Sequence, residues 1–193
     1  MSIESRLTLS APAPDLDLAA LAGREGLLDV AVGRVDTPVG EMIVAATEVG
    51  LVRASWFDEA STMQELATRV SPRIFETPER VDPIRRQLDE YFAGRRRQFD
   101  VTVDWILVGE WGRRVLAAAA RIPYGEVRTY GDVAAEAGSP KAFRAAGTAL
   151  GHNPVPVVVP CHRVLPAGGR TIGQYTGGVH IKEHLLHLEG VLA

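Results

Sequence analysis

The chain has 193 residues and a formal net charge of −3, and 46% of its residues are hydrophobic. That composition is ordinary for a globular protein with an apolar core, and no run of about 18 apolar residues predicts a membrane span. The N-terminus lacks a basic start followed by an apolar stretch, so we expect no secretory signal and a cytoplasmic location. With Cys161 as its single cysteine, the chain cannot hold an internal disulfide framework or a multi-cysteine zinc site.

Charge is unevenly distributed along the chain. Residues 1–104 carry 12 Lys and Arg against 18 Asp and Glu. Residues 105–193 carry 9 against 6, together with all five histidines and the cysteine. A polyanion would therefore prefer the second half, although so small an excess is not by itself evidence of nucleic-acid binding.

The first half predicts a small sheet. Residues 1–26 mix Ala, Pro, Leu and Asp without a sustained period, and we interpret them as an N-terminal extension. From Leu28 to Val32 apolar residues alternate with small or polar ones, which is the period of a half-buried strand. The apolar segments 41–47 and 51–57 follow after short turns that contain glycine, so we predict an antiparallel meander of three strands.

Helical patterns follow the predicted sheet. Ser61 is expected to cap one helix, and the Asp82-Pro83 pair is expected to begin a second helix that ends at Gly94. Together with the sheet, these helices predict an N-terminal α/β domain and linker over residues 27–104.

The second half, residues 105–193, predicts a mostly helical domain. We expect one helix over residues 113–121 and a short one over residues 130–137. Ser139 and Pro140 then provide a cap and a first-turn proline for a further helix. Two short helices joined by a tight turn that contains glycine are typical of a helix-turn-helix.

An apolar run, Val155–Pro160, leads directly into Cys161, His162 and Arg163. Because prolines favour extended geometry in the residues before them, we expect this run to be strand-like and buried. A lone cysteine is most often an inert small hydrophobic residue. This one lies where an apolar segment gives way to an imidazole and a guanidinium, and positive neighbours favour the nucleophilic thiolate. Cys161 is therefore a candidate nucleophile.

His162 is the candidate base for this thiol. Adjacent residues of an extended chain point to opposite sides, so His162 reaches Cys161 only if the backbone turns or a water bridges the two. The imidazole also needs an acceptor to orient it, and Glu189 is one candidate among several.

The sequence around this pair resembles the methylated-DNA–protein-cysteine methyltransferases, which are 6-O-alkylguanine-DNA alkyltransferases. The match consists of PCHRV preceded by NPVP and followed by YTGG, the upstream IPYGEVRTYGDVA, the RAAG of the second short helix and the terminal KEHLLHLEG. These blocks occur in the family's order and with its spacing over residues 122–190, and the resemblance extends weakly back to Leu28.

The resemblance implies a role for each matching residue. Cys161 would attack the alkyl carbon on the 6-oxygen of guanine and keep the alkyl group. His162 would deprotonate the thiol through a water, and Glu189 would orient the imidazole and balance its charge. Tyr130 would give a proton to the departing guanine, and Asn153 would hold the turn that presents the thiol.

The resemblance also implies two groups of binding residues. Arg144, on the second helix of the pair, would fill the gap that an extruded nucleotide leaves in the duplex. The other residues expected to contact DNA are Thr129, Tyr130, Ala145, Gly147 and Arg163. The residues expected to close around the flipped base are Pro156, Val164, Tyr175, Thr176 and Gly177.

The fold implied by the family is of the α/β (α+β) class. It would combine a small N-terminal antiparallel sheet with helices, which is ribonuclease-H-like, and a helical, winged-helix-like C-terminal domain with the helix-turn-helix. The expected partner is double-stranded DNA that contains O6-alkylguanine, bound by a monomer without a cofactor or a metal. Because a thioether is a poor leaving group, we expect each molecule to react once.

The chain departs from the bacterial pattern of the family in the helix before IPYG. Trp111 keeps an aromatic anchor where the pattern has Phe, but Gly112 lacks a side chain that could hydrogen-bond. Val115 and Leu116 follow where the pattern has Val and Trp, so Leu116 reduces the core volume. We expect local repacking and a looser contact between the two halves at this helix.

Other functions remain open at this stage. His180, His184 and His187 fall on one helical face and could bind zinc, although the HExxH spacing is missing. A non-catalytic regulator or an alkyltransferase-like sensor would bind DNA without repairing it. A regulator would normally have a more polar or basic recognition helix than this chain, and alkyltransferase-like sensors lack the cysteine that this chain has at Cys161. A Cys-His hydrolase and a homologue that acts on another alkylated substrate are the remaining alternatives.

Overall fold

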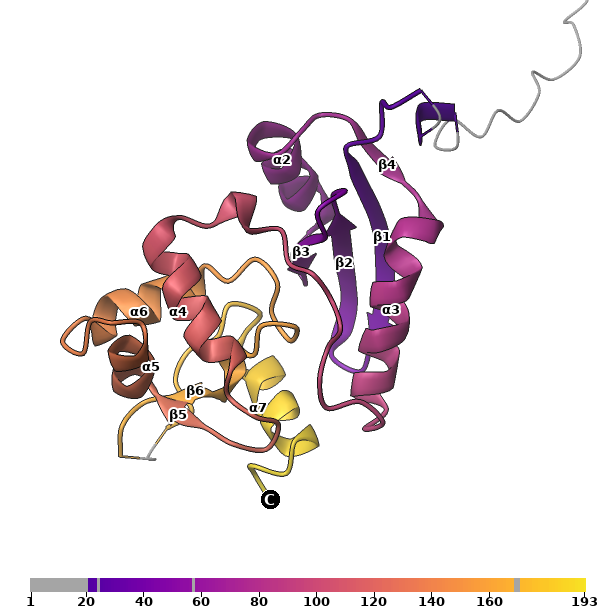
Figure 1. Ribbon diagram of the computed structural model, residues 1–193. Coiled ribbons are helices and arrows are strands. Elements are labelled where there is room, and N and C mark those ends of the chain that lie inside the picture. The colour runs from indigo at the N-terminus through magenta and orange to yellow at the C-terminus, as the bar shows by residue number, and fades with distance from the viewer. Residues whose placement is uncertain (1–20, 24, 57, 169–170) are drawn as a thin grey trace, which may run out of the picture.

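The structure is a computed structural model that describes residues 21–23, 25–56, 58–168 and 171–193. Most of the expected N-terminal extension, residues 1–20, lies outside the described residues. Figure 1 shows two parts side by side, a sheet with two helices and a mostly helical half that ends at the C-terminus. Within the described ranges, no helix is long and apolar enough to cross a membrane.

The first part is built on a four-stranded sheet. Its strands are β1 (Val30–Thr37), β2 (Gly40–Ala46), β3 (Leu51–Ser55) and β4 (Ile74–Glu76), in the order β3-β2-β1-β4. The predicted antiparallel meander of β1, β2 and β3 is confirmed. The sheet gains a strand that the sequence did not predict, because β4 pairs parallel with β1 and has only three residues. Such a segment is too short to show a strand period.

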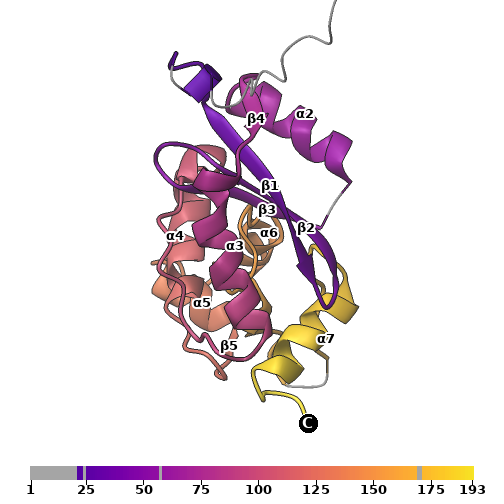
Figure 2. The same ribbon diagram turned by 90° about the vertical axis from the view of Figure 1, so that its right-hand side faces the viewer.

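Two helices accompany this sheet, and both begin before the predicted residue. Helix α2 (Glu59–Arg69) is capped by Asp58, whose carboxylate accepts the backbone N–H groups of Ala60 and Ser61. Ser61 was expected to be the cap, but it lies inside the first turn because Asp58 takes that position. Helix α3 (Pro78–Phe92) packs along the sheet (Figure 2).

Pro83 lies inside α3 rather than at its beginning, which corrects the second predicted helix start. The first-turn proline is Pro78, which the free N–H groups of that turn tolerate, whereas Pro83 is the sixth residue of the helix and removes one helical hydrogen bond.

The second part begins with a short 3₁₀ turn, η1 (Trp105–Leu107). Its remaining elements are α4 (Glu110–Ala120), β5 (Arg128–Thr129), α5 (Tyr130–Glu136), α6 (Phe143–Gly151), η2 (Cys161–Arg163), β6 (Val164–Leu165) and α7 (Val179–Leu188). The predicted pair of short helices is present as α5 and α6. Helix α6 begins at Phe143 instead of Pro140, and the Ala142 N–H donates to the Ser139 carbonyl in a turn ahead of it.

The run Val155–Pro160 is buried as predicted, but it is not a strand. The Val159 N–H donates to the Val155 carbonyl at 3.0 Å, which closes a tight turn. At its centre Val157 has φ 72°, a left-handed conformation that is strained for a β-branched residue. Such strain persists where surrounding contacts over-determine the backbone, and this turn leads directly into Cys161.

The two parts share one continuous apolar core. Backbone hydrogen bonds also connect them, since the Ala54 N–H of β3 donates to the Pro154 carbonyl at 2.8 Å. Gly112 on α4 does not leave a gap, because a Cβ at that position would lie 2.8 Å from Val108 Cγ1, and Leu116 is fully buried. The expected loosening at α4 is therefore not visible at these two positions.

Candidate active site

The candidate nucleophile lies at the wall of a cavity of about 290 Å³ in the C-terminal half. The residues that line this cavity are Tyr130, Gly147, Leu150, Gly151, Cys161, Gln174, Tyr175 and Thr176. They come from α5, α6, η2 and the segment before α7, so the cavity opens beside the helix pair. Cys161, Tyr130, Tyr175 and Thr176, which the sequence placed in one site, are thus brought together.

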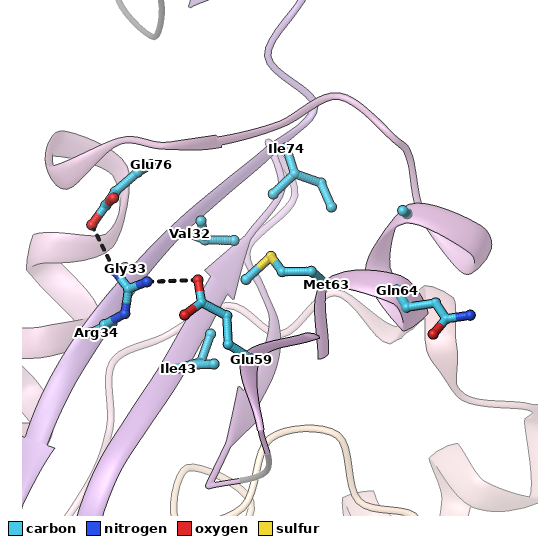
Figure 3. Close-up of a pocket in the computed structure, with 10 residues that line it drawn as sticks. Val32, Gly33, Arg34, Ile43, Glu59, Met63, Gln64, Ile74 and Glu76 are labelled. Carbon is cyan, nitrogen blue, oxygen red and sulfur yellow. Dashed lines mark hydrogen bonds and ion pairs between the residues drawn. The ribbon is translucent and has the colours of Figure 1, made fainter. Parts of the chain in front are cut away.

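A larger cavity of about 510 Å³ lies against the sheet in the N-terminal half (Figure 3). Val32, Ile43 and Met63 form part of its apolar lining. At its rim the Arg34 guanidinium is paired with Glu59 at 2.6 Å and with Glu76 at 3.2 Å (Figure 3). Since its lining holds no nucleophile and its arginine is already neutralised, we assign the chemistry to the cavity beside Cys161.

Asn153 ties the strained turn to the thiol. Its Oδ1 accepts the Val155 N–H at 3.1 Å, and its Nδ2 donates to the Val159 carbonyl at 2.8 Å. The same Nδ2 donates to Cys161 Sγ at 3.1 Å. Asn153 therefore fixes the backbone that presents the sulfur and also supplies a hydrogen-bond donor to it.

The Cys161 thiol is protonated at rest. Burial raises its pKa above the ordinary value, and this effect outweighs the lowering by the Asn153 amide, the Lys182 ammonium and the Tyr175 hydroxyl. The sequence suggested that positive neighbours favour the thiolate, but the adjacent Arg163 guanidinium is engaged elsewhere. A base is consequently needed to generate the nucleophile.

His162 is fully buried and is held by Glu189. Because Cys161–Arg163 forms a 3₁₀ turn, His162 is not forced to the opposite side of the chain from Cys161. Its Nε2 lies 2.9 Å from Glu189 Oε1, so the neutral ring carries its proton on Nε2 and donates it to the carboxylate. Burial lowers the His162 pKa despite the nearby carboxylate, which favours this neutral form.

The other imidazole nitrogen of His162, Nδ1, is buried and finds no hydrogen-bond partner among the described residues. In the neutral ring whose proton is on Nε2, Nδ1 carries a free lone pair and acts as an acceptor. An unpaired buried acceptor is costly and unusual, so it marks a position where a proton or a bridging water belongs.

Glu189 is the centre of a buried charge network. Its Oε2 accepts Arg163 Nε at 2.8 Å and its Oε1 accepts Arg163 Nη2 at 2.9 Å, which is a two-point ion pair. These bonds and the one to His162 outweigh burial and hold the pKa of Glu189 at about 2. The carboxylate is therefore charged whenever the protein is folded near neutral pH.

Arg163 does not occupy the position expected of a DNA-contacting residue. Its side chain is buried, and beside the ion pair with Glu189 its Nη1 donates to the Ile122 carbonyl at 2.6 Å. Each of its three nitrogens thus has a partner inside the protein, and the expected contact with DNA stays a prediction.

Three further predicted residues lie outside the cavity itself. Val164 is fully buried and belongs to β6, so it is not exposed to the cavity. Pro156 and Gly177 line a separate small space of about 50 Å³ beside Trp56 of the N-terminal part. They therefore line a neighbouring space and not the cavity beside Cys161. Thr176 borders both spaces, and its Oγ1 donates to the Gly151 carbonyl at 2.7 Å, which attaches this segment to the end of α6.

The helix pair presents the residues that were expected to contact DNA. Arg144 and Ala145 are exposed on α6, and a Cβ at Gly147 would lie 3.6 Å from the ring of Tyr130, which lines the cavity. Thr129 caps α5 through a reciprocal capping box with Asp132. The polar N-terminus of α5 and the small residues of α6 therefore lie next in the chain to Tyr130 and Gly147, which line the cavity.

The histidines of α7 were one of the alternative sites that the sequence left open. Among the residues that the structure describes, no group of three or more His, Cys, Asp or Glu side chains could hold a metal ion. His184 instead lies against the Phe92 ring of α3, with centroids 6.5 Å apart.

Both parts of the chain match models of one family. Residues 30–105 match the ribonuclease-like domain of 6-O-methylguanine DNA methyltransferase, and residues 110–191 match its DNA-binding domain. The chain belongs to the 6-O-methylguanine DNA methyltransferase family. The resemblance found in the sequence and the two-part α/β fold are thereby confirmed.

Relatives in this family span nearly the whole described chain. A methylated-DNA–protein-cysteine methyltransferase of Mycolicibacterium paratuberculosis is 40% identical over 155 residues, which cover 80% of this chain and 89% of the relative. A constitutive one of Bacillus subtilis is 37% identical over 161 residues, which cover 81% and 93%.

Solved structures agree with the sequence matches. The crystal structure of Mycobacterium tuberculosis O6-methylguanine methyltransferase superposes with a TM-score of 0.71 at 35% identity, over 85% of this chain and 94% of that one. The Mycobacterium tuberculosis OGT in complex with DNA gives a TM-score of 0.70 at 35% identity, over 84% and 92%.

Two residues of this 6-O-methylguanine DNA methyltransferase-like site were missed by the sequence analysis. Lys182 on α7 is almost fully buried, and its Nζ donates to the Val164 carbonyl at 2.7 Å. Burial lowers its pKa to about 8, while the nearby Cys161 opposes that shift. Tyr91 on α3 donates its hydroxyl proton to Glu189 Oε1 at 2.6 Å. In the sequence Lys182 falls within the matched KEHLLHLEG block, whereas Tyr91 shows no signal beyond an apolar helical period.

Proposed function

We propose that the protein repairs DNA by transferring the alkyl group of O6-alkylguanine to Cys161 in a single, irreversible turnover. The observation that carries this proposal is a buried thiol at the wall of a cavity, next in sequence to an imidazole whose free nitrogen has no partner and whose other nitrogen is held by a carboxylate. Family membership and the DNA-bound relative support the choice of substrate.

In the proposed step the thiol proton passes through a water to His162 Nδ1, and Glu189 stabilises the imidazolium that forms. The sulfur lone pair attacks the alkyl carbon, so a C–S bond forms while the C–O6 bond breaks and its electrons remain on guanine. Tyr130 gives a proton to the guanine as it leaves. Its pKa is raised by burial and by Cys161, which keeps the hydroxyl protonated until then.

The reacting carbon is inaccessible in a stacked duplex, so the target nucleotide has to be extruded into the cavity at a cost of a few kcal/mol. We propose that α5 and α6 approach the minor groove, where the small residues Ala145 and Gly147 permit close contact. Tyr175 and Thr176 then close over the base. A sequence-blind contact suits repair, because lesions occur in any sequence context.

The protein acts as a monomer without a cofactor in this proposal, and a free reactive thiol suits the reducing cytoplasm. A thioether is a poor leaving group, so the alkylated protein is the end product. Intact-mass measurement after incubation with an oligonucleotide that carries O6-methylguanine should show one methyl group per chain, mapped to the Cys161 peptide. An unmodified protein, or repeated turnover, would contradict the proposal.

Arg144 should separate base extrusion from chemistry. Arg144→Ala removes the exposed side chain that we expect to fill the gap in the duplex, so transfer from double-stranded DNA should slow by roughly tenfold or more. Reaction with free O6-alkylguanine, which needs no extrusion, should change little. The rates are measured by single-turnover transfer to both substrates.

The matched control for this prediction is Arg86→Ala, which removes an exposed arginine from α3 and should leave both rates unchanged. Equal losses on the duplex and on the free base would reject the wedge role of Arg144.

A further inference from the structure

The N-terminal part contributes a side chain to the charge network of the candidate active site. Tyr91 belongs to α3, is fully buried, and donates its hydroxyl proton to Glu189 Oε1 at 2.6 Å. The two residues are 98 positions apart in the chain, since Tyr91 belongs to α3 of the sheet part and Glu189 ends α7 of the helical part. The bond therefore exists only when the sheet part and the helical part are packed together (Figure 1).

We propose that Tyr91 is a positioning residue of the alkyl-transfer site, whose hydroxyl aims the Glu189 carboxylate and limits how strongly that carboxylate holds His162. This inference rests on the proposed function and adds to it the part played by the N-terminal half. Tyr91 acts through Glu189 and His162.

The distribution of donors around Glu189 shows how the Tyr91 hydrogen bond affects His162. Oε1 accepts from Tyr91, His162 Nε2 and Arg163 Nη2, whereas Oε2 accepts from Arg163 Nε and the Gly125 N–H. Tyr91 and His162 thus share one oxygen. Each additional donor withdraws charge from that oxygen, so loss of the Tyr91 hydroxyl would strengthen its interaction with His162 and favour the imidazolium.

Packing alone does not explain why a tyrosine occupies this position. The Tyr91 ring contacts the rings of Phe92, Phe99 and Tyr124 at centroid distances of 5.4, 5.4 and 6.2 Å, which a phenylalanine would do equally well. A buried hydroxyl costs free energy unless it is hydrogen-bonded, so its presence points to its bond with Glu189. Burial and the neighbouring carboxylate raise the Tyr91 pKa, which keeps the hydroxyl a donor.

Tyr91→Phe removes one hydroxyl and changes the chemistry of no other charged or titratable group around this network. His162 is faced by Glu189, by Arg163 of η2 and by Lys182 of α7, and it is adjacent to Cys161. The groups that face Glu189 in addition to His162 and Arg163 are Tyr91, Tyr124 and Tyr175. A shift in His162 titration after removal of one hydroxyl can therefore be assigned to that hydroxyl.

Tyr91→Phe is the test, and Tyr124→Phe is the matched control. Tyr124 belongs to the same ring cluster, but its hydroxyl donates to the Leu188 carbonyl at 2.7 Å and not to the carboxylate. The pH dependence of two rates is measured in each full-length variant. One is alkylation of Cys161 by iodoacetamide, which is unambiguous in a chain with one cysteine, and the other is methyl transfer from an O6-methylguanine oligonucleotide.

Both rates should rise with pH as His162 loses its proton. In Tyr91→Phe this rise should move to higher pH by roughly half to one unit, because a hydrogen bond to a charged group is worth about one to two units and part of that effect passes through Glu189 to His162. In Tyr124→Phe it should not move. Two outcomes would overturn the proposal. In one, the rates of Tyr91→Phe rise at the same pH as those of the wild type and are lowered equally at every pH. In the other, both variants show the same shift.

A measurement on the wild-type protein covers the case in which Tyr91→Phe does not fold. With ¹³C at the tyrosine Cζ atoms, the Tyr91 signal should move as His162 titrates, since both residues share Glu189 Oε1. A Tyr91 signal that is indifferent to that titration would overturn the proposal. Failure of the proposed function is distinguishable, because methyl transfer by the wild type would then be absent while the iodoacetamide profiles still report on Tyr91.

Discussion

Cys161→Ser should abolish methyl acceptance while leaving DNA binding intact. A serine hydroxyl is ionised far less readily than a thiol, and the loss of a catalytic nucleophile slows reaction by on the order of 10⁴-fold or more. The substitution keeps nearly the same volume in the turn held by Asn153, and its hydroxyl can still accept the Asn153 Nδ2 proton. Intact-mass analysis after incubation with O6-methylguanine DNA should show no added methyl group.

The control for Cys161→Ser is duplex binding measured by fluorescence anisotropy. Binding should be within about twofold of the wild type, because the thiol lies inside the cavity and not on the exposed face of α6. A methylated Cys161→Ser protein would assign the acceptor role to another residue. Loss of binding together with transfer would show that the substitution damaged the fold rather than the chemistry.

Glu189→Gln should destabilise the folded protein by about 3–5 kcal/mol at neutral pH. The substitution leaves the Arg163 guanidinium buried without its counter-ion and replaces the acceptor of His162 with a neutral amide. Denaturant unfolding measures this loss. Glu126→Gln is the control, since the Glu126–Arg128 pair is exposed and should contribute less than about 1 kcal/mol. A similar, small loss of unfolding free energy in both variants would mean that the ion pair between Glu189 and Arg163 contributes little to stability.

The same network predicts a pH dependence of stability. The Glu189 pKa is about 2 in the folded protein against an ordinary value of 4.5. A carboxylate with a lowered folded-state pKa stabilises the fold above its unfolded pKa, and that stability is lost as the pH falls through the folded value. Between about pH 4.5 and pH 2 the wild type should lose about 3 kcal/mol that Glu189→Gln lacks. Parallel acid-unfolding curves for the two proteins would contradict this.

The local pattern of the sequence predicted the elements that have a clear period. Alternation from Leu28 to Val32 and the apolar segments 41–47 and 51–57 predicted the strands of the meander. The short helix from Tyr130 was placed within one residue of its observed end at Glu136. The fourth strand, Ile74–Glu76, was missed because its pairing with β1 comes from tertiary contact and not from its own three residues. The strand expected at Val155–Pro160 is a turn, because side-chain bonds from Asn153 override the local preference for extended backbone.

Some residues of the candidate site could likewise be predicted from the sequence, and the position of others could not. Cys161, His162 and Glu189 were predicted from their residue types and from the family motifs, and the structure brings His162 and Glu189 into contact. Arg163 was expected at DNA, but a buried carboxylate offered it a stronger partner than solvent, and the arginine lies in the interior. A sequence does not show which charged neighbour will be buried beside which acceptor.

The sequence by itself determined the family of this protein and its candidate nucleophile, because the single cysteine and the family motifs around it are patterns of consecutive residues. The tertiary structure alone decided that the Cys161 thiol keeps its proton and which nitrogen of His162 is free. It also decided that Tyr91 of the N-terminal part reaches Glu189. The reason is physical: burial and hydrogen bonding between residues as far apart as 98 positions arise from the packing of the two parts, and no local pattern encodes them.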